Sequence, residues 1–244
     1  MTFCLGIKVK EGLVAFADTR ITSGNNTSSK KKISFEQMDN HSLFIMTSGL
    51  RSVRDKVIYY FNDMAKEKQE FNKLYKAVNA FGDLVKKVAE EDKVSLERSG
   101  LRFNLNTIIG GQLRDDEEHK LFLIYSEGNW VELDHYGSFV IIGNSSHGKT
   151  ILNRVLKPDS SMTQALKAGF LSFDSTRLSA NDVDFPVDVA LYPMGSFKMQ
   201  EHRYEKQDLE PISSFWETEV QEAMNRLPEE WINELKKNNQ APIQ

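Results

Sequence analysis

The chain has 244 residues, a net charge of −4, and 40% hydrophobic and 27% charged residues, which is an ordinary composition for a globular protein of one or two domains. The small net charge and the lack of a basic stripe interleaved with aromatic residues argue against a nucleic-acid-binding protein. The single cysteine, Cys4, excludes an intramolecular disulfide framework and indicates a cytoplasmic location.

Neither a membrane segment nor a metal site is expected. The first residues, MTFCLGIKVK, lack the charged leader and apolar core of a signal peptide, and no run of about eighteen apolar residues occurs. The five histidines do not have the spacing of metal ligands. We therefore expect no metal ion and no other cofactor.

The first part of the chain predicts antiparallel sheet. Apolar side chains alternate along residues 2–9, a turn follows at 10–12, and the next run is apolar throughout before it ends in Asp18. This pattern predicts a hairpin whose second strand is buried on both faces. After a polar stretch, a second strand pair is expected over residues 32–38 and 41–49.

The apolar period then changes from two residues to about 3.6, which predicts two consecutive helices near residues 50–61 and 74–88. Strands are expected again near residues 104–113, 120–128 and 138–143. A short helix should follow at 151–156. Another should begin after Ser161, because Ser161 and Gln164 have the spacing of a capping box.

The C-terminal part predicts two strands near residues 187–193 and 196–203 and then a last helix that begins after Pro211. The helix should bury one apolar side, formed by Trp216, Val220, Met224 and Leu227.

Groups of antiparallel strands that alternate with helix pairs indicate the α+β class. Two antiparallel sheets would stack face to face with helices on each outer side, which is an αββα four-layer sandwich. No repeat or linker interrupts this order, so we expect a single domain over residues 1–237 and a flexible tail over 238–244.

The segment 143–150, GNSSHGKT, matches the phosphate-binding motif G-x-x-x-x-G-K-[ST] of nucleotide hydrolases and stands between an apolar strand and a helix. Such a loop belongs to a parallel sheet with βαβ crossovers, whereas the neighbouring segments predict hairpins. No later strand ends in an acidic residue placed to hold magnesium. Nucleotide hydrolysis is therefore the weaker interpretation, and a tight turn with a solvated Lys149 is the other.

A candidate nucleophile lies at the second residue. Removal of Met1 would leave Thr2 as the amino terminus at the start of a strand, with a hydroxyl and an α-amine on one residue. The amine suits a general base because its reference pKa of about 7.7–8.0 is close to operating pH. Threonine paired with an N-terminal amine is an established catalytic arrangement.

Three further residues fit this chemistry. Asp18 ends a buried strand beside that of Thr2, and its buried carboxylate needs a partner, which Lys32 could supply. A lysine held beside the hydroxyl would lower the pKa of the hydroxyl. Gly49 ends a strand before a helix, so its N–H is placed to stabilise an oxyanion. For Lys30 and Lys31 we expect solvated side chains.

Several segments together resemble proteasome β-type subunits, and among them the Anbu family of bacterial proteasome homologues. They are MTFCLGIKVKEGLVAFADTRITSG, KKIS, MTSGLRS, FDSTRLS and VDFPVDVALY. The resemblance covers nearly the whole chain. It implies an N-terminal nucleophile hydrolase with the αββα sandwich, assembled into hexameric or dodecameric rings or open spirals.

The resemblance also implies roles for single residues. It implies that Thr2 is the nucleophile, that Asp18 and Lys32 are its charged partners and that Gly49 is the oxyanion glycine. Asp174 and Ser179 would support the amine, although two extra residues separate them here. A serine of the GNSS turn would approach the amine, and because Asn144 stands at the family's position, we choose Ser145. The implied substrate-binding residues are Ile21, Thr22 and Thr47.

The sequence therefore predicts a threonine-type peptidase or amidohydrolase. It would act as a homo-oligomer on a peptide or protein substrate, without nucleic acid or a membrane. A non-catalytic scaffold or binding subunit of the same fold is the main alternative. Nothing in Ile21 or Thr47 determines which substrate is cleaved.

Overall fold

The computed structural model describes residues 2–23, 26–66, 71–134 and 139–238. Contacts within the chain divide it into two compact units, Met1–Glu205 and Lys206–Gln244. The boundary between the two units, after Glu205, lies inside the range 1–237 that was predicted as a single domain. Residues 239–244 of the expected tail lie outside the described part of the chain.

The described residues of the first unit form twelve strands and four helices. The strands are β1 (Phe3–Val9), β2 (Gly12–Asp18), β3 (Arg20–Ser23), β4 (Asn26–Ser29), β5 (Ile33–Met38), β6 (His41–Gly49), β7 (Leu105–Leu113), β8 (Lys120–Ile124), β9 (Trp130–Glu132), β10 (Phe139–Gly143), β11 (Val187–Pro193) and β12 (Gln200–Tyr204). The helices are α1 (Arg51–Lys66), α2 (Leu74–Arg98), α3 (Lys149–Val155) and α4 (Met162–Ser179).

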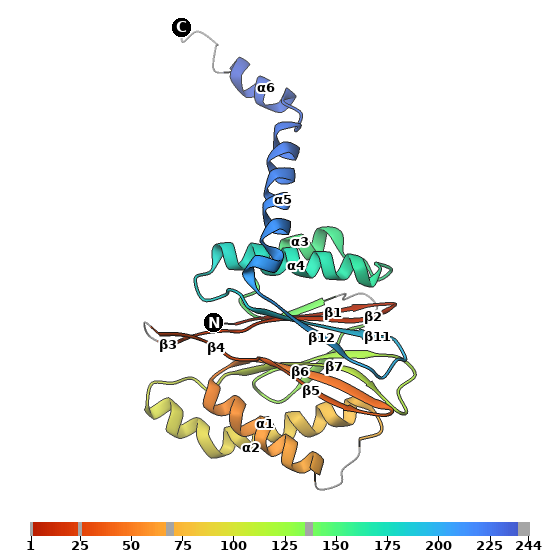
Figure 1. Cartoon of the computed structure of the whole chain (residues 1–244). Coiled ribbons are helices and arrows are strands. Elements are labelled where there is room, and N and C mark those ends of the chain that lie inside the picture. The colour runs from red at the N-terminus through yellow and green to blue at the C-terminus, as the bar shows by residue number, and fades with distance from the viewer. Residues whose placement is uncertain (1, 24–25, 67–70, 135–138, 239–244) are drawn as a thin grey trace. The chain divides into compact units, whose positions relative to one another are not determined.

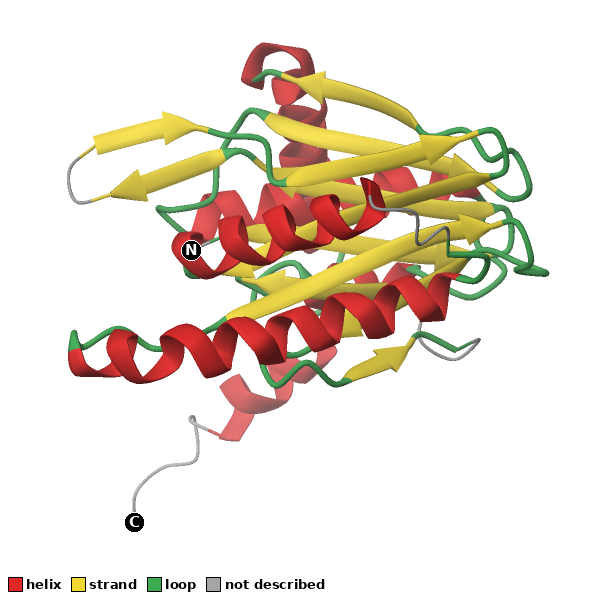
Figure 2. Ribbon diagram, turned by 90° about the horizontal axis from the view of Figure 1, so that it is seen from below, coloured by secondary structure: helices red, strands yellow, loops and turns green. Residues whose placement is uncertain are grey.

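This unit is the four-layer sandwich that the sequence predicts (Figure 1). One sheet has the strand order β10-β1-β2-β11-β12 and the other the order β5-β6-β7-β8-β9. Both sheets are antiparallel throughout their described strands. Helices α3 and α4 cover the first sheet, and α1 and α2 cover the second (Figure 1). The small hairpin β3–β4 extends beyond the sheets (Figure 2).

The hairpin of β1 and β2 lies at the centre of the first sheet. Every residue of both strands is buried, because α4 covers one face and the second sheet covers the other. The predicted pairing is confirmed, with Cys4 opposite Ala17 and Val9 opposite Gly12. Gly12 has a φ of +152°, and a Cβ there would lie 2.0 Å from the carbonyl oxygen of Tyr192, so only glycine fits this turn.

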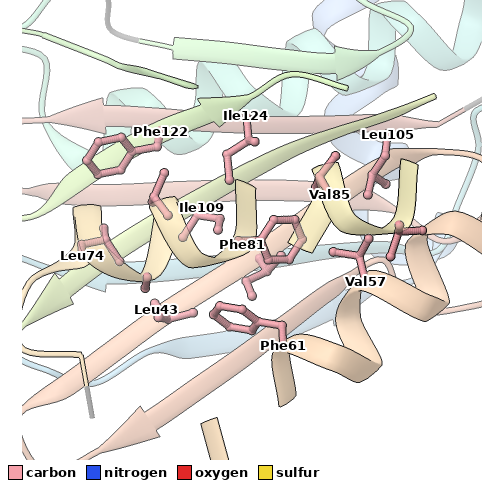
Figure 3. Close-up of a cluster of buried hydrophobic side chains, with 14 of the residues drawn as sticks. Leu43, Val57, Phe61, Leu74, Phe81, Val85, Leu105, Ile109, Phe122 and Ile124 are labelled. Atoms are coloured by element: carbon pink, nitrogen blue, oxygen red, sulfur yellow. The ribbon is translucent and has the colours of Figure 1, made fainter. Parts of the chain in front are cut away.

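Among the described residues, two clusters of buried side chains stabilise the unit. One fills the space between the two sheets and includes Phe44, Ile108 and Tyr192. The other lies between the second sheet and the helices α1 and α2, where the rings of Phe61 and Phe81 meet edge to face at 5.3 Å between centroids (Figure 3). Apolar positions at helical spacing in α1 and α2 supply this second cluster, as predicted.

The predicted capping box of α4 is confirmed. The Ser161 hydroxyl accepts a bond from the Gln164 N–H at 3.2 Å, and the Ser161 N–H donates to the Gln164 side chain at 2.8 Å. The strands β3, β4 and β9 were not predicted, because their residues lack an extended alternation of apolar and polar side chains.

The second unit consists of α5 (Lys206–Asn225) and α6 (Glu230–Asn238). The predicted start of the last helix after Pro211 is wrong, because α5 begins at Lys206 and includes the proline. Pro211 lies close to the helix start, where its missing N–H removes only a bond to the first turn. Among the described helices none is long and apolar enough to span a membrane.

The apolar side expected to be buried on this helix is exposed in the single chain. The side chains of Trp216, Val220, Met224 and Leu227 are 36%, 47%, 62% and 63% exposed. The prediction failed because an apolar helical period identifies a face that avoids water but does not identify the surface that covers it.

The second core cluster gives a stability prediction. Phe81 is fully buried against Phe61, so Phe81→Ala should lower the free energy of unfolding by about 3–5 kcal/mol in urea denaturation. Tyr59→Ala is the control. It also removes a large ring, here from α1, but Tyr59 is 69% exposed, so the free energy of unfolding should change by only about 0.5 kcal/mol. Equal losses in the two variants would contradict the assignment of this core.

Candidate active site

The site is built around a buried ion pair between Asp18, the last residue of β2, and Lys32, which immediately precedes β5. The Lys32 ammonium donates to both carboxylate oxygens of Asp18, at 2.7 and 2.8 Å, and to the Arg20 carbonyl oxygen at 2.7 Å. The exposed fraction is 4% for the Lys32 side chain and 0% for Asp18. The predicted pairing of these residues is thus confirmed.

Burial determines the titration of the acid in this pair. It raises the pKa of Asp18 to about 6, and the positive charge and hydrogen bonds of Lys32 oppose this increase, as does the Phe3 N–H. The carboxylate therefore depends on its partners to remain ionised. These partners come from β1 and from the start of β5, so the pair also fixes the relative positions of the two sheets.

Thr2 precedes β1, and its backbone is held on both sides. The N–H of the next residue, Phe3, donates to Asp18 Oδ1 at 2.7 Å. The Thr2 carbonyl accepts a bond from the Asn144 N–H at 2.7 Å. These bonds place Thr2 between the ion pair and the end of β10.

Gly143 permits this close approach. Its φ is +87°, and a Cβ at this position would lie 1.8 Å from the Thr2 carbonyl oxygen. A side chain here would therefore be strained and would also displace Thr2. The same Cβ would lie 3.2 Å from the Ser48 hydroxyl, so the end of β6 adjoins Thr2 and Gly143.

Gly49, the predicted oxyanion residue, follows Ser48 and ends β6. It has a φ of +146°, and a Cβ would lie 2.1 Å from the carbonyl oxygen of Asn104. The next residue, Leu50, donates its N–H to the same oxygen at 2.8 Å. The backbone turns sharply here into α1, and this turn requires glycine.

The predicted substrate-binding residues lie in β3 and β6. Ile21 and Thr22 lie in β3, whose first residue, Arg20, binds Lys32 through its carbonyl. Thr47 lies in β6 opposite Thr107, and neither hydroxyl has a hydrogen-bond partner among the described residues. Two buried hydroxyls without partners are costly, so this part of β6 keeps polar groups that the fold itself does not use.

The residues predicted to support the amine belong to α4 and to the turn after β10. Asp174 is buried in α4, where its Oδ1 accepts from Arg177 Nε at 2.8 Å and pairs with Arg177 Nη2 at 2.7 Å. Ser179 is exposed at the last residue of α4, and Ser145 is exposed after β10. The Asn144 side chain accepts a bond from Ser146 at 3.1 Å, so the backbone of Asn144 contacts Thr2 and its side chain closes the turn. The roles of Asp174, Ser179 and Ser145 stay predictions.

The structure gives GNSSHGKT a packing role. Its preceding strand, β10, is antiparallel to β1, which excludes the parallel βαβ context of a nucleotide hydrolase at this position. Gly148 approaches α4 so closely that a Cβ would lie 2.1 Å from the Ser172 hydroxyl. Lys149 is exposed as the first residue of α3. The tight-turn interpretation is therefore confirmed.

Two features of the site were not predicted. One is the Asn144 N–H that binds Thr2, because a backbone donor leaves no mark in the side-chain pattern. The other is Asp182, in the link after α4. Burial acts to raise the pKa of Asp182, but positively charged groups, Lys32 among them, outweigh burial and lower it. An acidic residue directly before the segment VDFPVDVALY was the available signal.

Lys30 and Lys31 are exposed, so the expectation of solvated side chains is confirmed. The exposed fraction is 42% for the Lys30 side chain and 44% for that of Lys31. Both also make ion pairs: Lys31 binds Glu201 at 2.7 Å, and the Lys30 ammonium lies 3.7 Å from Asp55 in α1.

Known structures resemble the chain over most of its length. The Gly-1 mutant of Anbu from Hyphomicrobium sp. strain MC1 is 28% identical, with a TM-score of 0.86, and the match covers 93% of this chain and 98% of that one. Anbu (ancestral β-subunit) from Yersinia bercovieri is 26% identical with a TM-score of 0.85 and the same coverage. The helical assembly of the Anbu complex from Pseudomonas aeruginosa has the same fold, at 23% identity, a TM-score of 0.86 and coverage of 93% and 97%.

No protein with a curated function matches the chain. The sequence pattern of the proteasome subunit family, however, matches residues 2–182, which include the ion pair, β6 and α4. The chain therefore belongs to the proteasome subunit family, and its fold is that of the Anbu structures.

Proposed function

We propose that the protein is a threonine-type amide hydrolase whose nucleophile is the Thr2 hydroxyl, exposed with its amine after removal of Met1. The observation that carries this proposal is the buried Asp18–Lys32 pair, bonded to the backbone directly after Thr2. A buried ion pair is a weak source of stability, because desolvation opposes the attraction of the charges. A catalytic use accounts for its position beside Thr2.

The reaction would proceed in two halves. The Thr2 amine, directly or through water, accepts the hydroxyl proton while Oγ1 attacks the substrate carbonyl carbon. The tetrahedral oxyanion accepts a hydrogen bond from the Gly49 N–H, and the amine then returns the proton to the leaving nitrogen. Water next hydrolyses the ester on Thr2, which releases a carboxylic acid and restores the hydroxyl.

The two charged residues would act through electrostatics. The Lys32 ammonium favours the developing alkoxide of Thr2, and Asp18 keeps that ammonium in place and compensates its charge. The Phe3 N–H to Asp18 bond fixes the backbone of the nucleophile relative to the pair. The strand β3 would bind an extended substrate alongside Thr22 by β-augmentation.

The alternative functions are less well supported. A scaffold or binding subunit would have no use for a buried, paired lysine next to an available terminal threonine. A nucleotide hydrolase would need the parallel sheet that β10 lacks.

We also propose a homo-oligomer of hexameric or dodecameric scale, as a ring or open spiral. The Pseudomonas aeruginosa relative is described as a helical assembly. The apolar stripe of Ile212, Trp216, Val220 and Met224 repeats every four residues along α5 and is exposed in the single chain. Exposed stripes of this kind are typical of protein interfaces. A cytoplasmic location stays a prediction.

Thr2 gives the most direct test of the mechanism. Intact mass should show the loss of Met1, and a threonine-directed electrophile such as a peptide epoxyketone should add once, at Thr2. Thr2→Ala should form no adduct, because no other residue combines the hydroxyl with a terminal amine. Retention of Met1 in a preparation that forms the adduct would contradict the proposal, since the amine would be tied up in a peptide bond.

Asp18 gives a test by titration. The carboxyl carbon of Asp18, followed by NMR, should titrate with a pKa of about 6. In Lys32→Met this pKa should rise further, because the removed positive charge favours the ionised form. The rate of adduct formation should fall by about 10²–10³-fold, as for other lost electrostatic stabilisers.

Lys31→Met is the matched control for the titration. Lys31 is the neighbouring lysine but pairs with Glu201 on β12, so its loss should leave both the Asp18 pKa and the adduct rate unchanged. An Asp18 pKa that is the same in the wild type and in Lys32→Met would refute the electrostatic role of the pair.

The assembly is tested on α5. Val220→Glu places one charge in the apolar stripe and should shift native mass spectra from oligomers to smaller species. Thr218→Glu places the same charge on the opposite helix face and should leave the assembly unchanged. Because both substitutions favour helix formation, loss of the helix cannot explain a difference. Intact oligomers in the first variant would exclude this face as an interface.

A further inference from the structure

Four charged side chains gather where the segment before β5 meets the first turns of α1. They are Lys30, Arg51, Arg54 and Asp55, and we call them the basic cluster. Asp55 lies 3.7 Å from the Lys30 ammonium and 3.4 Å from Arg51 Nε. Arg54 donates to Asp55 through Nε at 2.9 Å and Nη2 at 2.6 Å. The cations together lower the pKa of Asp55 against the effect of its burial.

The basic cluster adjoins the proposed catalytic residues. Lys30 precedes Lys32 by two residues, and Arg51 follows Gly49 by two residues. The charge of Arg54 also reaches Cys4, two residues after Thr2. Burial raises the pKa of the Cys4 thiol, and Arg54 is among the positive groups that oppose this increase. Lys32 pairs with Asp18, and Ser48 adjoins Gly143, which contacts Thr2, so both chain segments that carry the cluster pass directly by the site.

The charges of the cluster do not balance. Three cations share one carboxylate, which leaves an excess of two positive charges (3 − 1). The nearby cations Lys32 and Arg20 each pair with a carboxylate, Lys32 with Asp18 and Arg20 with Asp184 at 2.9 Å, so they do not add to this excess. The basic cluster therefore carries a net positive charge.

The position of the basic cluster at the start of α1 makes its excess of positive charge more unfavourable. The first turn of α1 contains no acidic residue and begins with Arg51. A cation at the positive end of a helix dipole is unfavourable. A sequence that breaks a local rule in this way usually does so at a functional site, and an anion would relieve the repulsion.

We propose that the basic cluster binds an acidic side chain of the substrate, an Asp or Glu, on the residue that contributes the attacked carbonyl. This inference rests on the proposed function. Arg51 and Lys30 are free to exchange partners, because their side chains are 66% and 42% exposed and such surface ion pairs are weak. The Arg54 side chain is 12% exposed and retains Asp55.

Binding is tested without chemistry in Thr2→Ala. Calorimetry compares the peptides Ac-Ala-Ala-Ala-Xaa-Ala-Ala-amide with Xaa as Glu, Gln or Lys. The Glu peptide should bind about tenfold more tightly than its Gln isostere, as expected for one charge-assisted hydrogen bond, and the Lys peptide should bind least. The preference should decrease as the salt concentration rises.

Two substitutions should change this preference in opposite directions. Arg51→Gln, made in the same Thr2→Ala background, should reduce the Glu/Gln affinity ratio towards one. Asp55→Asn should increase it, because it removes the internal competitor for the same cations. A merely structural role of these residues would move both ratios in the same direction or neither.

Arg114→Gln is the matched control. Arg114 Nε also pairs with a carboxylate, that of Asp115 at 3.5 Å, and its side chain is 57% exposed. It follows the end of β7 that pairs with His41, whereas Gly49 pairs with the other end, about 26 Å away along the strand. The Glu/Gln ratio should not change in this variant.

The outcomes separate the inference from the proposed function. A Glu peptide that binds no more tightly than the Gln peptide overturns the inference. The electrophile reaction of the wild type at Thr2 would still stand in that case. If no electrophile adds to Thr2 but the Glu peptide binds with the predicted preference, the cluster is an acidic-peptide site and the hydrolase proposal fails.

Discussion

The buried pair of Asp18 and Lys32 is the interaction on which the rest of the site depends. Both side chains are removed from water, so each requires the other, and the remaining polar atoms need further partners. Those partners are the Phe3 N–H and the Arg20 carbonyl. The pair thereby brings the start of β1, the end of β2, the start of β3 and the approach to β5 to one point.

The sandwich makes this convergence possible. The hairpin of β1 and β2 is covered on both faces, which excludes water from Asp18 and raises its pKa. The second sheet supplies β6, whose residue Ser48 adjoins Thr2 and Gly143 and which ends at Gly49. The backbone can turn this closely only because Gly143 and Gly49 carry no Cβ. A Cβ on Gly143 would lie 1.8 Å from a neighbouring carbonyl oxygen, and one on Gly49 would lie 2.1 Å from another.

The charges that remain around this core are not explained by folding. Arg51 and Arg54 stand at the positive end of α1, where acidic residues would stabilise the helix. On α5, apolar side chains are exposed where polar ones would be expected. Both features fit the binding partners that we propose, an acidic substrate at the start of α1 and a further copy of the chain on α5.

The sequence by itself determined the antiparallel sandwich and the order of its main strands and helices, but not the short strands β3, β4 and β9. The alternation in β1, the helical period of α1 and α2 and the capping box of α4 are local patterns, and each follows from which side chains avoid water or bond to a neighbouring turn. The same reasoning predicted that a charge at Asp18 would need Lys32. The resemblance to proteasome β-type subunits supplied the predicted roles of the remaining site residues.

Only the tertiary structure decided how those residues meet. The bond from the Asn144 N–H to Thr2 depends on the register of β10 against β1, and a register is a property of two strands. The basic cluster forms only in the folded chain, because Lys30 lies 25 residues before Asp55 in sequence (55 − 30) and the fold brings the two together. The exposed face of α5 was misjudged because hydrophobic periodicity marks a surface for burial, whereas the surface that covers it is fixed only by packing.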